Sequence, residues 1–90
     1  MPRVRNMTSP RTGNPVANQF IIEDDNGETF QSYRTTIARR DNDGGLTLDR
    51  NALDYSVTTS KYLYGFLDAD RKELKAGIAD GSIKVADLNR

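Results

Sequence analysis

The stretch LDYSVTTSKYLYGFL, residues 53–67, decides the fold predicted for this chain, because it contains the clearest helix. Leu63, Phe66 and Leu67 recur at the i, i+3, i+4 spacing that lines one face of a helix. Tyr62 lies one turn before Phe66 and extends the same stripe. We therefore expect a short amphipathic helix that packs its apolar stripe on the rest of the chain.

A cluster of hydroxyl side chains precedes this helix. The side-chain oxygen of Thr58 or Thr59 can cap it by accepting a hydrogen bond from one of its first backbone N–H groups. Tyr55 and Ser56 then form a polar, aromatic shoulder beside the cap. Tyr64 lies on the face opposite the apolar stripe, so we expect its ring to be exposed.

A second helix and a last strand follow. Asp70 and Glu73 have the spacing of a capping box, which predicts a helix over residues 71–80. Gly81 is placed to end this helix in the left-handed conformation. Residues 82–88 alternate apolar and polar side chains and predict a strand that returns to the sheet.

Upstream, two apolar runs at residues 16–24 and 28–33 flank an Asn-Gly pair, an arrangement typical of a β-hairpin. A three-residue loop keeps Phe20, Ile22 and Phe30 on one face, whereas a two-residue loop mixes core and solvent side chains. We therefore predict the three-residue loop, with Ile22 opposite Phe30. In this register the solvent face of the hairpin carries Gln19, Ile21, Gln31 and Tyr33.

Two more short strands are predicted at residues 35–40 and 46–48, separated by a turn at DNDGG, residues 41–45. Their inward side chains are Ile37, Leu46 and Leu48. Together these elements predict a small α+β domain. It has an antiparallel sheet of four or five strands that begins with a hairpin, and two short α-helices packed on one face.

The N-terminal residues 1–15 differ from the rest of the chain. They contain all three prolines, three arginines and no acidic residue, and they show no apolar periodicity. We predict a flexible basic arm over residues 1–15, followed by a single α+β domain over residues 16–90.

The composition excludes several kinds of site. The 13 basic and 13 acidic residues cancel, so no overall charge draws the protein to nucleic acid or to an anionic membrane. The chain has no cysteine and no histidine, which excludes disulfides, thiolate metal sites and the usual general base. No apolar run approaches the ~18 residues that a membrane span requires, so we expect no membrane partner.

Catalysis and metal binding find little support in the motifs. DNDGG opens with the Asp-x-Asp spacing of a calcium loop, but Gly45 and Ala52 occupy the fifth and twelfth positions, where that loop needs ligands. Ser60 and Lys61 are adjacent on a helix and do not face each other. The carboxylates are better explained as turn and cap residues. We predict no catalytic residue, no cofactor and no metal site, and a protein that is not an enzyme.

Nucleic-acid binding is the alternative that the residues leave open. Aromatic side chains on a sheet can stack on bases while arginines hold phosphates. The arginines available for this role, beside Tyr33, are Arg3, Arg5, Arg11, Arg34, Arg39 and Arg40. The acidic hairpin tip and the zero net charge oppose it.

A set of short runs carries one resemblance. The runs are VANQF (16–20), FQSY (30–33), IA (37–38), LD (48–49), DYS (54–56), TT (58–59), KY (61–62) and FL (66–67). They resemble a family of small, functionally uncharacterised proteins of tailed bacteriophages and prophages, over about residues 14–89. Leu53 departs from the pattern, since an aromatic residue is expected there. The resemblance implies a setting, the cytoplasm of the bacterial host, and no activity.

We therefore predict a non-enzymatic phage accessory protein that binds and modulates a host or phage protein. Tyrosine is enriched at binding hot spots, which favours the shoulder, Tyr64 and the solvent face of the hairpin. The predicted partner-binding residues are Gln19, Gln31, Tyr33, Tyr55, Ser56, Thr58, Thr59 and Tyr64. A homodimer that pairs exposed edge strands is a further expectation, and a structural role in the virion is not separable by sequence.

Overall fold

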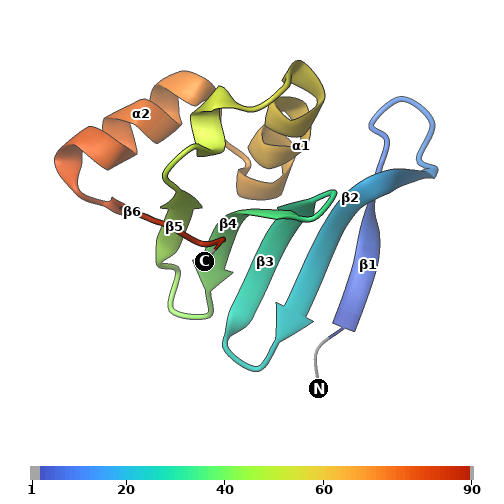
Figure 1. Cartoon of the computed structure of the whole chain (residues 1–90), viewed down its shortest axis with the longest axis horizontal. Helices are drawn as coiled ribbons and strands as arrows, with labels where there is room; N and C mark the ends of the chain where they lie inside the picture. Colours follow the sequence, from blue (N-terminus) through green and yellow to red (C-terminus); the bar gives the residue numbers. More distant parts are fainter. Residues whose placement is uncertain (1–2, 90) are drawn as a thin grey trace.

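Six strands lie in one sheet in the same order as in the sequence, and two helices lie on one side of it (Figure 1). This computed structural model describes residues 3–89. The strands are β1 (Arg3–Thr8), β2 (Pro15–Asp24), β3 (Gly27–Ser32), β4 (Thr35–Asp41), β5 (Leu46–Asp49) and β6 (Ile83–Ala86). A 3₁₀ turn (Ala52–Asp54) precedes the helices α1 (Val57–Leu67) and α2 (Arg71–Asp80).

The predicted fold class is confirmed. The structure is α+β, its sheet begins with hairpins, and both helices pack on the same face, α1 against β3 and α2 against β6. Strands β1 to β5 pair antiparallel, whereas β6 runs parallel to β5. The sheet has six strands because β1 adds one at the N-terminal edge.

The flexible arm predicted at the N-terminus is wrong for residues 3–8. These residues form β1, which pairs antiparallel with β2 and places Val4 opposite Ile22. An ion pair between Arg5 Nε and Glu23 Oε1 at 2.9 Å strengthens the pairing. Because an edge strand is held mainly by backbone hydrogen bonds, it needs no apolar periodicity, and the sequence pattern therefore gives no sign of it.

The predicted register of the β2–β3 hairpin is also wrong. Two residues form the loop, with Asp24 opposite Gly27 and Ile21 opposite Phe30. The carboxylate of Asp24 accepts hydrogen bonds from the backbone N–H groups of Asn26 and Gly27, at 2.8 and 3.0 Å, which closes the tight turn. This register puts Ile21 on the helix-covered face and leaves the neighbouring Phe20 and Ile22 on the open face.

The core lies between the sheet and α1. The predicted helix stripe is confirmed, since Tyr62, Leu63, Phe66 and Leu67 are all buried. The ring of Phe66 stacks on Phe30 at a centroid distance of 5.8 Å. The predicted inward residues Ile37 and Leu48 are buried as well, and Leu46 is half-buried. Helix α2 adds Leu74 to the same core.

The caps explain where the helices begin. Ser56, rather than either predicted threonine, caps α1, because its Oγ accepts from the Thr59 backbone N–H at 3.2 Å. The predicted capping box of Asp70 and Glu73 is confirmed at α2. Gly81 ends α2 in the left-handed conformation, as predicted.

Within residues 3–89, neither helix has the length and apolar content that a membrane span requires.

Candidate functional site

The tyrosine end of the molecule, which we define as Tyr33, Tyr55, Ser56, Val57 and Thr59, joins the β3–β4 turn to the start of α1. Four of these residues were predicted to bind a partner, and they line one hollow of about 220 Å³, together with Ser32, Thr35 and Ile37. Residues from β3, β4 and α1 therefore meet at one place. No pattern in the sequence predicts that Tyr33 lies beside Tyr55.

Tyr33 has an unusual backbone. Its φ is +56°, in the left-handed region, and the residue is 61% exposed. Its N–H donates to the Asn18 carbonyl at 2.6 Å, and its carbonyl accepts from Gln31 Nε2 at 2.8 Å. Ser32 pairs with Thr35, so the loop has two residues, and only the first has positive φ, a position where glycine is favoured. A tyrosine there costs roughly 1–2 kcal/mol of backbone strain. The fold thus holds an aromatic ring in solvent at a cost.

Tyr55 is fixed by a buried carboxylate. Its hydroxyl donates to Asp49 Oδ2 at 3.1 Å, and burial together with this bond raises the pKa of Tyr55. Asp49 is only 3% exposed and also accepts from the backbone N–H groups of Leu88 and Asn51, at 3.0 and 3.1 Å. Burial by itself raises the pKa of Asp49, but these hydrogen bonds outweigh it and leave the pKa below its usual value. Asp49 is therefore a rigid, charged support for the Tyr55 ring.

A second hollow, of about 680 Å³, lies on the other side of Tyr55. It is lined by Leu53, Tyr55, Val57, Ser60, Lys61, Tyr64 and Arg71. Tyr64 is half-buried and packs against the core, so only part of its ring is available to a partner. Thr58 is exposed and lines neither of the two hollows.

Val57 is a residue that sequence reasoning missed. It is 87% exposed at the first position of α1. A cap at Thr58 or Thr59 starts the predicted helix too late and leaves Val57 outside it. Ser is preferred over Thr at the N-cap, so Ser56 itself is the signal that could have placed the cap correctly.

The two glutamines of the predicted site differ in position: Gln31 lies on the open face of the sheet, whereas Gln19 is buried. Gln19 is 1% exposed, because the true register turns it into the core, and its assignment to the surface is wrong. Its Oε1 has no hydrogen-bond partner among residues 3–89. Gln31 is half-buried on the open face of the sheet and holds the Tyr33 carbonyl. Gln31 therefore positions Tyr33.

The arginines of the alternative site are not brought together. Arg39 lies on the open face of the sheet and Arg40 on the helix-covered face, where its guanidinium is 4.8 Å from the Phe66 ring centroid. Carboxylates lie beside both, and Arg40 Nη2 is 3.8 Å from Glu28 Oε2. The others lie apart: Arg34 is in the β3–β4 turn, Arg3 and Arg5 are on β1, and Arg11 is in the β1–β2 loop.

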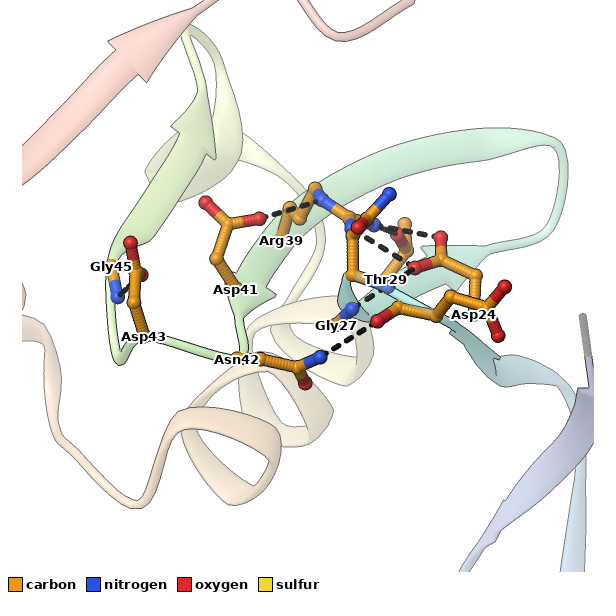
Figure 2. A network of polar contacts seen from close by, with 10 residues as sticks. Asp24, Gly27, Thr29, Arg39, Asp41, Asn42, Asp43 and Gly45 are labelled. Atoms are coloured by element: carbon orange, nitrogen blue, oxygen red, sulfur yellow. Dashed lines mark hydrogen bonds and ion pairs between the residues drawn. The ribbon is translucent and has the colours of Figure 1, made fainter.

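The acidic turn end, which we define as residues 24–29 and 39–45, lies at the other end of strands β3 and β4 from the β3–β4 turn (Figure 1). Figure 2 shows its polar contacts. Arg39 donates to both carboxylate oxygens of Asp24, at 3.1 Å each, and to Asp41 Oδ1 at 3.0 Å. The hydrogen bonds from Arg39 and from the backbone lower the pKa of Asp24. Asp43 accepts from the Gly45 backbone N–H at 2.9 Å, so the DNDGG aspartates serve the turn. No group of three acidic side chains placed to hold a metal occurs between residues 3 and 89.

Comparison with known proteins gives one match. The model of a family of unknown function, DUF8033, matches residues 3–81, from β1 to the end of α2. No curated protein and no solved structure matches the chain.

Proposed function

We propose a function for a chain that belongs to DUF8033, a family of unknown function: it binds a partner protein through the tyrosine end and carries out no chemistry. In this proposal the protein is a phage or prophage accessory protein that binds and modulates a host or phage protein in the bacterial cytoplasm. The resemblance of its short sequence runs to small phage proteins supports that setting.

The conformation of Tyr33 carries the proposal. An exposed aromatic ring gains little from the fold, and its left-handed backbone lowers stability. Glycine or asparagine would serve the turn better. Strain of this kind is typical of ligand-binding positions, because the surrounding structure maintains it for another purpose.

The neighbours of Tyr33 suit a protein partner. The hydroxyl of Tyr55 is bonded to Asp49, which holds the ring in place. Val57 adds an exposed apolar side chain at the second hollow, which Tyr55 also lines. Rigid aromatic anchors bind at low entropic cost, and tyrosine is enriched at interface hot spots. Ser56 is exposed and adds a hydroxyl group to this surface. Thr59 is only 6% exposed and its hydroxyl is bonded to Ser32 and Ser56, so it supports the surface from beneath.

Nucleic-acid binding is the second candidate and has weaker support. Arg5, Arg39 and Arg40 each lie beside a carboxylate, and they occupy two faces and two elements of the sheet. A phosphate backbone needs several cations along one path. Arg34 next to Tyr33 is a pair that suits stacking with phosphate contact.

The test is capture from a bacterial lysate with immobilised protein, with and without nuclease. Wild-type protein is compared with Tyr33→Asn, which removes the ring and accepts positive φ. The matched control is Val4→Thr on β1, because Val4 is 64% exposed, close to the 61% of Tyr33. We expect the wild type and Val4→Thr to capture the same protein at a stoichiometric level, and Tyr33→Asn to lose at least about 90% of it.

Two results would contradict the proposal. Equal capture by Tyr33→Asn would remove the tyrosine end from the interface. Material that disappears with nuclease, and binding whose log K falls steeply with log salt, would favour the nucleic-acid function instead.

A further inference from the structure

A hollow of about 340 Å³ lies between the β1–β2 hairpin and α1, apart from the tyrosine end. It is lined by Arg5, Met7, Thr8, Pro10, Ile21, Lys61, Tyr62 and Gly65. The side chains of Ile21 and Tyr62, each only 7% exposed, form its apolar floor. Its volume lies in the lower part of the range of small-molecule sites, about 300–1,000 Å³.

Gly65 lines the hollow, and no packing contact among the described residues requires a glycine there. It lies inside α1 without positive φ, where glycine is the least favourable residue other than proline. A Cβ at Gly65 would meet no atom within 4 Å among the described neighbours. Gly77 in α2 differs, because a Cβ there would meet Ile83 Cδ1 at 2.5 Å. Packing therefore explains Gly77 and leaves Gly65 unexplained.

The rim of the hollow is positively charged. Arg5 and Lys61 are the charged residues that line it, and no lining residue is acidic. Arg5 Nε is bonded to Glu23 Oε1 at 2.9 Å, so its charge is largely offset. Lys61 Nζ lies 5.6 Å from the centroid of the Tyr62 ring, so its charge is next to the apolar floor. The hollow therefore complements an apolar body that carries a single negative charge.

We propose that this hollow binds a small amphiphilic carboxylate. Its apolar body would lie on Ile21 and Tyr62 along the open side of Gly65, and its carboxylate would lie near Lys61. This hollow shares Lys61 with the second hollow beside Tyr55, and the carboxylate proposal does not rest on the proposed partner binding.

The experiment is a titration of the full chain, labelled with ¹⁵N, with sodium octanoate and separately with octylammonium chloride. We expect octanoate to shift the amide signals of Met7, Ile21 and Gly65 in a saturable way. Octylammonium has the same body and the opposite charge, and we expect it to give no saturable shift.

Three variants locate the site. Gly65→Ala should raise the Tm by about 4 °C, since alanine favours the helix, and weaken octanoate binding about tenfold, since its methyl group would occupy part of the space along which the apolar body is proposed to lie. Lys61→Gln should weaken binding about three- to fivefold, because an exposed ion pair is lost. Lys72→Gln removes a charge from exposed α2, away from the hollow, and should leave binding unchanged.

The opposite results would overturn the proposal. These are equal binding of octanoate and octylammonium, unchanged affinity in Gly65→Ala, and no saturable shift up to about 10 mM octanoate, which corresponds to negligible affinity. Shifts caused by acetyl-Leu-Asp-amide and not by octanoate would assign the hollow to an acidic peptide of a partner protein, and would also overturn the proposal.

Discussion

The acidic turn end and the tyrosine end both reverse the chain between antiparallel strands, and they do so with opposite choices of residue. At the acidic turn end, Asp24, Asp41 and Gly27 occupy positions that suit them, and the carboxylates are bonded (Figure 2). At the tyrosine end, Tyr33 takes a position that suits glycine, and its ring is exposed. The difference indicates that stability accounts for the residues at the acidic turn end. Stability does not account for a tyrosine at position 33.

The largest expected effect is at the acidic turn end. A Cβ at Gly27 would collide with the Arg40 carbonyl oxygen and lie 2.9 Å from Asp41 Cα, and φ is +156°. Gly27→Ala should therefore lower the free energy of unfolding by about 3 kcal/mol in urea denaturation. Gly44→Ala is the control, since Gly44 has φ +90° but open space around it, and should cost about 1 kcal/mol. Equal losses in the two variants would show that close approach at Gly27 is unimportant.

A second prediction tests whether Asp49, which holds the Tyr55 hydroxyl of the tyrosine end, also stabilises the fold. Asp49→Asn should lower the free energy of unfolding by about 2 kcal/mol, because a buried charged acceptor of bonds from Asn51, Leu88 and Tyr55 is lost. Urea denaturation at pH 7 measures it. A loss below about 0.5 kcal/mol, the size of an ordinary surface substitution, would contradict this role.

The pH dependence of stability follows from the same carboxylate. The folded-state pKa of Asp49 is lowered, so its stabilising contribution is complete above the unfolded-state pKa of about 4. It is lost as the pH falls through the folded pKa. The pKa of Asp24 is lowered too, mainly by its bond to Arg39, with the same sign. Thermal unfolding between pH 7 and 2 should show stability falling below about pH 4, and a smaller fall in Asp49→Asn.

A third prediction concerns the polar residue buried beneath the tyrosine end. Gln19 pairs with Ser32 on the core face, and its Oε1 lacks a partner in the part of the chain described. Gln19→Met should raise the free energy of unfolding by about 1 kcal/mol, because an unsatisfied buried acceptor is removed. Gln31→Met is the matched control and should give no gain, since the bond to the Tyr33 carbonyl is lost. A destabilised Gln19→Met would indicate that an unseen water satisfies Oε1.

The smallest effect on stability is expected at Tyr33, and it is the one that separates the two ends most sharply. Tyr33→Asn should change the free energy of unfolding by less than about 0.5 kcal/mol, or raise it, because asparagine tolerates positive φ. Urea denaturation, run beside the capture experiment, measures it. A loss of about 2 kcal/mol or more would place the Tyr33 ring among the groups that hold the fold.

The local elements were predictable from sequence, because their causes are local. The stripe of α1 and the capping box of Asp70 and Glu73 depend on residues within one or two turns of each other. The hairpin register was not, because Phe20, Ile21 and Ile22 are consecutive apolar residues that can serve either face. The hydrogen bonds that the Asp24 carboxylate accepts favour the two-residue turn, which sets the register. The pattern of apolar residues contains no information about these hydrogen bonds.

The candidate site was predictable in part. Tyr55, Ser56 and Thr59 stood out as a cluster, but what joins them to Tyr33 is the hydrogen bond of Thr59 to Ser32 across the core, at 3.0 Å. Such a contact between distant residues leaves no periodic pattern in the sequence. The positive φ of Tyr33 follows from the two-residue turn, and tyrosine is no signal for such a turn.

The agreement between strand order and chain order affects how the molecule assembles. From β1 to β5, each strand pairs with the one made just before it, so closing each loop costs little entropy. Sheets of this kind have low contact order and fold quickly for their size. Strand β6 is different, because in the sequence both helices come between it and β5, the strand with which it pairs. The sheet should therefore grow during synthesis from the N-terminal edge, and β6 should be the last strand to join.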